Sequence, residues 1–203
     1  ALLGLVEGLT EYLPVSSTGH LILTSTLLGR EGDPAIKSFE VVIQAGAILA
    51  VTLIYWRRII DLLTRWDDPE NRDYLLKLTV AFLITAVLGL IVAALGFELP
   101  ENAEPVAWAL VLGGFWMIAA EWLAEKQEDR SEILWRVAIA VGVAQIVAGV
   151  FPGLSRSGTT IFVAMLLGTS NRAAATEFAF LVGIPTMYAA SAMASPTKIK
   201  PTT

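Results

Sequence analysis

The sequence of 203 residues contains no cysteine, a single histidine and few charged side chains. The absence of cysteine excludes disulfides, a thiolate nucleophile, a haem thioether and a cysteine-ligated zinc site. Charged residues make up 16% of the chain and apolar residues 55%, whereas soluble domains average about 25% and about 45–50%. This composition indicates a membrane protein. The net charge of −5 argues against a nucleic-acid binder.

Long segments without Asp, Glu, Lys or Arg predict membrane-spanning helices. A helix needs roughly 17–25 mostly apolar residues to cross a hydrocarbon core of about 30 Å. The candidate runs are 38–56, 78–97, 105–124 and 178–197. The first and third runs reach this length only if each is allowed one charged residue, Glu40 and Glu121 respectively. A soluble bundle is the alternative, but it would have to bury too much apolar surface, so we predict an all-α, polytopic integral membrane protein.

Shorter apolar segments are interrupted by proline and serine. Segments 1–12 and 18–29 are too short to cross a membrane separately, and so is 157–168. Broken backbone at membrane depth is tolerated only where protein encloses it or a wet cavity borders it. We therefore predict that the first two segments form a re-entrant helix hairpin. A signal peptide is the competing interpretation of 1–12, but it fails because the stretch carries Glu7 and Glu11 and no basic region.

An internal repeat relates the two ends of the chain. The positions aligned at an offset of 138 are Gly4/Gly142, Glu7/Gln145, Pro14/Pro152 and Ser17/Ser155, and Phe39 aligns with Phe178 at an offset of 139. We predict one transmembrane domain, 1–203, with repeat 1 over about 1–56 and repeat 2 over about 137–195. Each repeat is a re-entrant hairpin followed by a span. Chance similarity of membrane sequence rich in glycine and proline is the alternative.

Three predicted spans, 39–56, 75–95 and 106–124, separate the hairpins, and an odd number makes the repeats inverted. The side formed by 57–77, 125–136 and 169–176 carries nine of the fourteen Lys and Arg residues. The other side carries four, namely Arg30, Lys37, Lys198 and Lys200, and Arg156 lies at the second hairpin tip. The positive-inside rule places the more basic side in the cytoplasm and both chain ends outside.

Two carboxylates lie in the first apolar segment. Glu7 and Glu11 are spaced i, i+4, so a helix places them on one face. Their burial costs several kcal/mol unless they are protonated, paired or bound to a cation. Oxygen ligands of this kind suit Mg²⁺ or Ca²⁺. Alternatively, Glu7 and Glu11 could face lipid or a loop near the membrane interface. Glu40 and Gln44 repeat the i, i+4 spacing, and they could either supplement the site or form hydrogen bonds between helices.

Two loops gather hydroxyl groups with one histidine and one arginine. Residues 14–20 read PVSSTGH and residues 152–160 read PGLSRSGTT, and the second loop opens a predicted helix. Backbone N–H groups, a helix N-terminus and a guanidinium suit phosphate oxygens. The alternative is a capped turn whose arginine extends to the interface. With the carboxylates, these groups are the components of metal-assisted phosphoryl transfer.

The sequence resembles the undecaprenyl-diphosphate phosphatase family, also called bacitracin-resistance proteins. The residues that carry the resemblance are EGLTEYLPVSSTGH at 7–20, FEVVIQ at 39–44, PGLSRSG at 152–158, and Thr160. The resemblance covers essentially the whole chain. Family members continue for a few further spans, so we expect this chain to be truncated, as its polar tail and lack of an initiator Met also suggest.

The resemblance implies an enzyme of the bacterial inner membrane whose site opens outward. Its substrate would be undecaprenyl diphosphate, hydrolysed to the monophosphate carrier that peptidoglycan synthesis reuses, with bacitracin resistance as a result. The residues implied as catalytic are Glu7, Glu11, Ser17, His20 and Arg156, with Glu7 and Glu11 binding Mg²⁺ or Ca²⁺. Those implied in substrate binding are Ser16, Ser155, Arg156, Ser157 and Thr160. Monomer and homodimer both stay open.

Two questions of mechanism and class follow. Ser17 would attack phosphorus with His20 accepting its proton, or His20 would activate water directly. Another class of lipid phosphatase depends on two histidines, and this chain has one. A transporter or lipid flippase is the stronger rival, because inverted repeats and midplane carboxylates are typical of it too.

Overall fold

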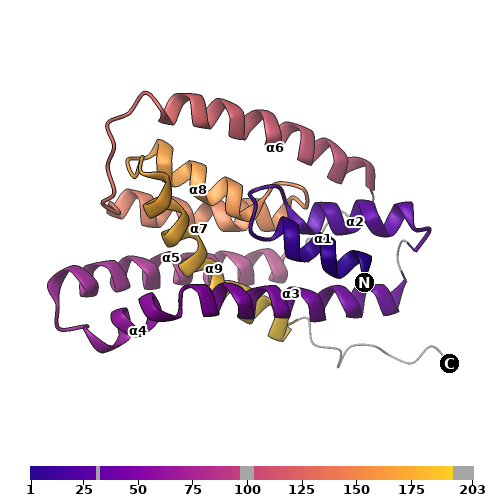
Figure 1. Ribbon diagram of the computed structural model, residues 1–203, viewed down its shortest axis with the longest axis horizontal. Helices are drawn as coiled ribbons and strands as arrows, with labels where there is room; N and C mark the ends of the chain where they lie inside the picture. Colours follow the sequence, from indigo (N-terminus) through magenta and orange to yellow (C-terminus); the bar gives the residue numbers. More distant parts are fainter. Residues whose placement is uncertain (31–32, 97–102, 194–203) are drawn as a thin grey trace.

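The computed structural model describes residues 1–30, 33–96 and 103–193, and the elements in these ranges are all helices (Figure 1). They are α1 (Leu2–Thr10), α2 (Ser17–Leu27), α3 (Pro34–Ile54), α4 (Trp56–Thr64), α5 (Pro69–Ala94), α6 (Ala103–Ala124), α7 (Trp135–Val150), α8 (Arg156–Leu166) and α9 (Arg172–Met193). The predicted all-α class is confirmed. Lys198 and Lys200, which entered the orientation argument, lie outside the described residues.

Three helices, α5, α6 and α9, are long and apolar enough to cross a membrane. Helices α3 and α4 pass the same test together but bend by 61° between Ile54 and Trp56. The chain is thus a multi-pass membrane protein, and its described residues include three candidate spans, or four if the bent pair crosses as one. The predicted span 38–56 missed this bend, after which Arg58 of α4 meets Glu177 of α9 with Nε 3.0 Å from Oε1.

Side-chain caps begin several helices. The Asp68 carboxylate accepts a hydrogen bond from the Glu70 N–H at 3.0 Å and Pro69 opens the first turn, so α5 begins well before the predicted 75. Asn171 accepts from the Ala174 N–H at 3.0 Å and so begins α9. Charged first turns of this kind extend a helix beyond its apolar run.

Helix α7 is packed most closely, against α5. A Cβ atom on Gly142 would lie 2.7 Å from the Ala81 carbonyl oxygen, so only glycine allows this approach. Thr85 bridges the same two helices, with its hydroxyl 2.9 Å from the Gly142 carbonyl oxygen. Small residues and backbone-directed hydroxyls commonly hold membrane helices together. This packing fixes α7, which forms part of the cavity wall described below.

The short pairs α1–α2 and α7–α8 approach from opposite ends of the molecule, and their breaks meet near its middle under α6 (Figure 1). Two glycines make the contact close. A Cβ atom on Gly19 would lie 3.2 Å from Gly153 Cα, and one on Gly158 would lie 3.0 Å from the Pro14 carbonyl oxygen. Each break therefore packs backbone to backbone against the other.

The connections from α4 to α5, from α6 to α7 and from α8 to α9 lie together at the end opposite the N-terminus (Figure 1). Hydrogen bonds join two of them: Thr169 donates to the Glu132 carbonyl at 2.8 Å, and the Asn171 N–H donates to the Arg130 carbonyl at 3.0 Å. The segments that carry the nine basic residues of the orientation argument thus share one end of the molecule.

Candidate active site

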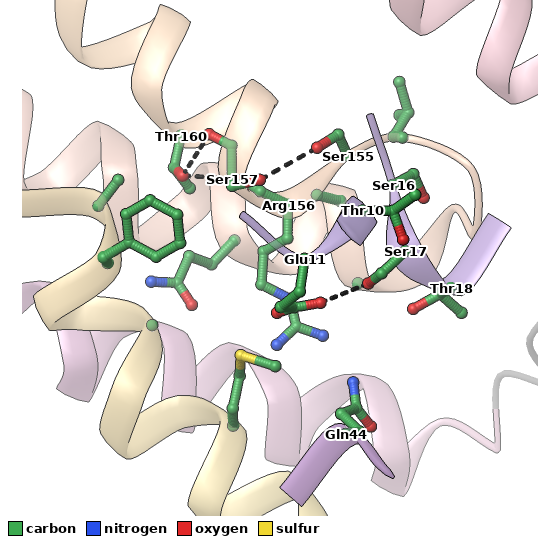
Figure 2. A pocket seen from close by; sticks show the side chains of 18 of the residues that line it. Thr10, Glu11, Ser16, Ser17, Thr18, Gln44, Ser155, Arg156, Ser157 and Thr160 are labelled. Carbon is green, nitrogen blue, oxygen red and sulfur yellow. Dashed lines mark hydrogen bonds between the residues drawn. The ribbon is translucent and has the colours of Figure 1, made fainter. Parts of the chain in front are cut away.

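A cavity of about 260 Å³ lies where the two helix breaks meet. Its polar wall comes from the two breaks and from α3 and α7, and apolar side chains of α3 and α9 complete it. Of the predicted site residues, those lining it are Glu11, Ser16, Ser17, Ser155, Arg156, Ser157 and Thr160 (Figure 2). The structure therefore brings together side chains that lie about 140 positions apart in the chain.

The first break is built around Ser16. Its φ of 65° lies in the left-handed region, a conformation that costs a non-glycine residue roughly 1–3 kcal/mol. The Ser16 hydroxyl accepts a hydrogen bond from the Gly19 N–H at 3.2 Å and so caps α2. The sharp reversal brings Ser17, the first residue of α2, to the cavity.

The Ser17 hydroxyl donates a hydrogen bond to Glu11, with Oγ 2.5 Å from Oε2 (Figure 2). Glu11 directly follows α1 as its C-terminal cap residue, so the bond spans the break. A hydroxyl has one proton to donate. In this structure Ser17 therefore gives its proton to a carboxylate and not to His20, which the sequence-based mechanism named as its acceptor.

His20 lies one turn into α2, where its Nδ1–H donates to the Ser16 carbonyl at 2.9 Å. A carbonyl oxygen only accepts, so this bond assigns the proton of a neutral imidazole to Nδ1 and leaves Nε2 as the basic nitrogen. Among the described residues, the side chains lining the cavity do not include His20. The hydrogen bond from its ring to the Ser16 carbonyl also stabilises the first break.

The second break repeats the cap of the first. The Ser155 hydroxyl accepts from the Gly158 N–H at 3.0 Å and lies 3.2 Å from the Ser157 hydroxyl. Thr160 lines the cavity, but its hydroxyl donates its hydrogen bond within α8, to the Arg156 carbonyl at 2.8 Å. Thr160 can therefore only accept a hydrogen bond from a ligand.

Arg156 opens α8 and extends into the cavity toward Glu11 (Figure 2). The guanidinium and the Glu11 carboxylate attract each other electrostatically. Helices α2 and α8 both begin at the cavity, with Ser17 and Arg156 as their first residues. Their N-termini and the guanidinium together favour an anion with several oxygens.

Glu7 of α1 is buried, with 1% of its surface exposed, and it is not among the described residues that line the cavity. Neither of its carboxylate oxygens has a hydrogen-bond partner. Glu11 and Glu40 act on it electrostatically. A buried carboxylate without a partner costs several kcal/mol, which a bound cation would offset.

The donor chemistry of Glu7 and Glu11 fits Mg²⁺ or Ca²⁺. Both ions prefer carboxylate oxygens, and Mg²⁺ commonly takes one or two carboxylates together with phosphate oxygens and water. Within the described ranges, no group of three Asp, Glu, His or Cys residues is placed to bind a metal ion. A cation held here would therefore complete its coordination with substrate and water.

The sequence reasoning missed part of the cavity wall. Gln145 of α7 and Thr10 and Thr18 beside the first break all line it and received no role. Gln44, which was left with two open roles, lines it too. The repeat alignment placed Gln145 opposite Glu7, and that alignment was the signal available for it.

Comparison with known proteins identifies the family of the chain. The model of the family described as bacitracin resistance protein BacA matches residues 1–202. A protein named undecaprenyl-diphosphatase from Rhizobium etli (strain CIAT 652) is 70% identical over 191 residues, which are 94% of this chain and 71% of the relative. One of the same name from Xanthomonas oryzae pv. oryzae (strain PXO99A) is 58% identical over 193 residues, 95% of this chain and 71% of the relative. The chain therefore belongs to the BacA family of bacitracin resistance proteins.

Proposed function

We propose that this protein is an undecaprenyl-diphosphatase, which hydrolyses undecaprenyl diphosphate to undecaprenyl phosphate and inorganic phosphate. The observation that carries the proposal is the hydrogen bond from Ser17 to Glu11 in a cavity that Arg156 also enters. The family and the names of its relatives support the same activity. A serine on a carboxylate beside a guanidinium suits phosphoryl transfer better than ion transport.

The cavity wall matches a lipid diphosphate in chemistry. The two serine-rich breaks present hydroxyls, helix N-termini and a guanidinium to the diphosphate group. Phe180, Ile184 and Met187 of α9 offer an apolar surface for the first part of the prenyl chain. The rest of that chain stays in the bilayer.

Ser17 acts as the nucleophile in the scheme that the hydrogen bond favours. Its oxygen attacks the terminal phosphorus while Glu11 takes the hydroxyl proton, and the bond to the bridging oxygen breaks. Undecaprenyl phosphate leaves, and water, activated by Nε2 of His20, then releases phosphate from Ser17. Arg156 offsets charge on the terminal phosphate throughout. In the alternative scheme, His20 activates water for direct attack.

Glu7 and Glu11 are the residues that would hold a divalent cation, Mg²⁺ or Ca²⁺. When bound, it supplies positive charge that lowers the cost of bringing a diphosphate beside carboxylates and of breaking the P–O bond. Both Glu7 oxygens lack protein partners, and Ser17 donates to one of the two Glu11 oxygens, so both carboxylates would have oxygen atoms available for a cation.

The pairs α1–α2 and α7–α8 are re-entrant hairpins of two inverted repeats. Their approach from opposite ends supports this arrangement. The positive-inside rule supports an inner-membrane protein with its basic end in the cytoplasm. We propose that the site opens outward, where it would recycle the carrier for peptidoglycan synthesis and confer bacitracin resistance. Association as a homodimer stays a prediction.

Phosphate release from farnesyl diphosphate or undecaprenyl diphosphate by purified protein in detergent tests the function. We expect release that stops with EDTA and returns with Mg²⁺ or Ca²⁺. A flippase would instead move labelled lipid across a vesicle membrane and release no phosphate. That result, from folded wild-type protein, would replace the enzyme with the transporter.

Rapid quenching with substrate labelled at the terminal phosphate tests the nucleophile. We expect transient label on Ser17, found by peptide mass spectrometry, and none in Ser17→Ala. Turnover by the wild type without label on Ser17 at any quench time would support direct attack by water.

A further inference from the structure

Gln145 of α7 is a polar side chain that the scheme above does not use. It is 3% exposed, and neither its amide oxygen nor its amide nitrogen has a hydrogen-bond partner. Among the described residues, only the Glu7 carboxylate shares this condition. Gln145 also lines the same cavity as Glu11, Ser17 and Arg156.

A buried amide without partners costs about 1–3 kcal/mol. Side chains in that state are rare and usually meet water, an ion or a ligand. Helix α7 is held firmly by its neighbours, since Val141, Gly142 and Ala144 beside Gln145 are all buried. The amide therefore stays at the cavity wall in the free protein, ready to bind.

The chemistry of an amide identifies what it binds. Gln145 aligns with Glu7 at the offset of 138, so one repeat carries a carboxylate where the other carries an amide. A carboxylate accepts only, whereas an amide of nearly the same shape adds two N–H donors. Donors attract phosphate oxygens, and carboxylates repel them. We propose that Gln145 is a substrate-binding residue whose amide N–H donates to an oxygen of the diphosphate group, an inference that rests on the proposed function.

Substitution by methionine separates this role from a structural one. Gln145→Met keeps the length of the side chain and removes its polar atoms, so the free protein loses an unsatisfied buried group. The Tm of the substrate-free variant should match or exceed that of the wild type. An amide that stabilised the fold would instead give a lower Tm.

Steady-state phosphate release from farnesyl diphosphate measures the binding role. Losing a hydrogen bond to a charged oxygen predicts a KM about ten- to a hundredfold higher in Gln145→Met, with kcat within about threefold of the wild type. Gln145→Glu should raise KM further, because it sets a carboxylate against the phosphate. Gln127→Met is the matched control, since this exposed glutamine lies outside the cavity, and its KM should not change.

Inorganic diphosphate provides a second readout that needs no turnover. It should raise the Tm of the wild type and of Gln127→Met, and raise that of Gln145→Met much less. An unchanged KM and an unchanged diphosphate shift in Gln145→Met would overturn the inference, and so would a marked fall in its substrate-free Tm. Wild-type protein that releases no phosphate would overturn the proposed function itself, a separate result.

Discussion

At the scale of single residues, the site depends on where each proton lies. Ser17 donates to Glu11, and His20 donates from Nδ1 to the backbone of the first break. In the proposed mechanism these two bonds correspond to two steps: Glu11 accepts the Ser17 proton during the attack, and Nε2 of His20 activates the water that follows. This division could not be predicted from the sequence, because Glu11 and His20 both lie within six residues of Ser17.

Removal of the His20 imidazole should therefore slow the second step most. In His20→Ala, we expect turnover at least about a hundredfold lower and label from the terminal phosphate that accumulates on Ser17. Rapid quenching followed by mass spectrometry measures both. A variant that turns over slowly and carries no label would assign His20 to the first chemical step.

At the scale of elements, the two helix breaks have the same local design. Ser16 and Ser155 cap α2 and α8, and each accepts from the glycine three residues on, Gly19 or Gly158. These pairs align at an offset of 139, the offset that also aligns Phe39 with Phe178. The predicted offset of 138 matched Ser17 with Ser155, whereas the caps match Ser17 with Arg156. Both are the first residues of their helices, and each reaches the cavity.

A methyl group on Gly158 should push the breaks apart. Its carbon would lie 2.6 Å from Met117 Sδ and 3.0 Å from the Pro14 carbonyl oxygen. We expect Gly158→Ala to lower the free energy of unfolding by about 1–3 kcal/mol and to reduce phosphate release, because the two halves of the site separate.

Thermal unfolding in detergent and the phosphate assay measure these effects. Gly114→Ala in α6 is the matched control, because its Cβ atom would meet nothing within 4 Å. It should leave stability unchanged or raise it by up to about 1 kcal/mol. Equal behaviour of the two variants would contradict the close packing of the breaks.

Charge-free runs were sufficient to predict the helical class and the approximate place of α5, α6 and α9. They could not predict the bend at Tyr55, because neither proline nor glycine marks it. The ion pair that follows the bend joins Arg58 to Glu177, which is far along the chain. Asp68 and Pro69 indicate the early start of α5, because they are typical residues at a helix N-terminus. A search for uncharged runs cannot find this start, because the first turn of α5 contains charged residues. The burial of Glu7 and Gln145 without partners depends on tertiary packing, which the local sequence does not reveal.

At the scale of the whole molecule, the distribution of basic residues predicts the orientation. The connections after α4, α6 and α8 share one end, and from the positive-inside rule we expect that end to face the cytoplasm. The site lies between the two ends, where the breaks meet. Because the chain has no cysteine, a single introduced thiol can report its own side of the membrane without background.

We expect Arg30→Cys, just after α2, to react with a membrane-impermeant maleimide in intact spheroplasts. Asp67→Cys, between α4 and α5, should react only after the membrane is opened. Both substitutions are on connections outside the cavity. Labelling of Asp67→Cys in intact spheroplasts, with Arg30→Cys protected, would show the reverse orientation.

We propose that both helix breaks together form one lipid-diphosphate phosphatase site. Its most direct test is phosphate release from farnesyl diphosphate by the wild type, by Glu11→Gln in the first break and by Arg156→Lys in the second. We expect active wild-type protein and a loss of at least about a hundredfold in kcat/KM for each variant. The control Glu125→Gln, on an exposed residue, should keep wild-type activity. Normal turnover in either site variant, or none in folded wild-type protein, would show that the two breaks do not form such a site.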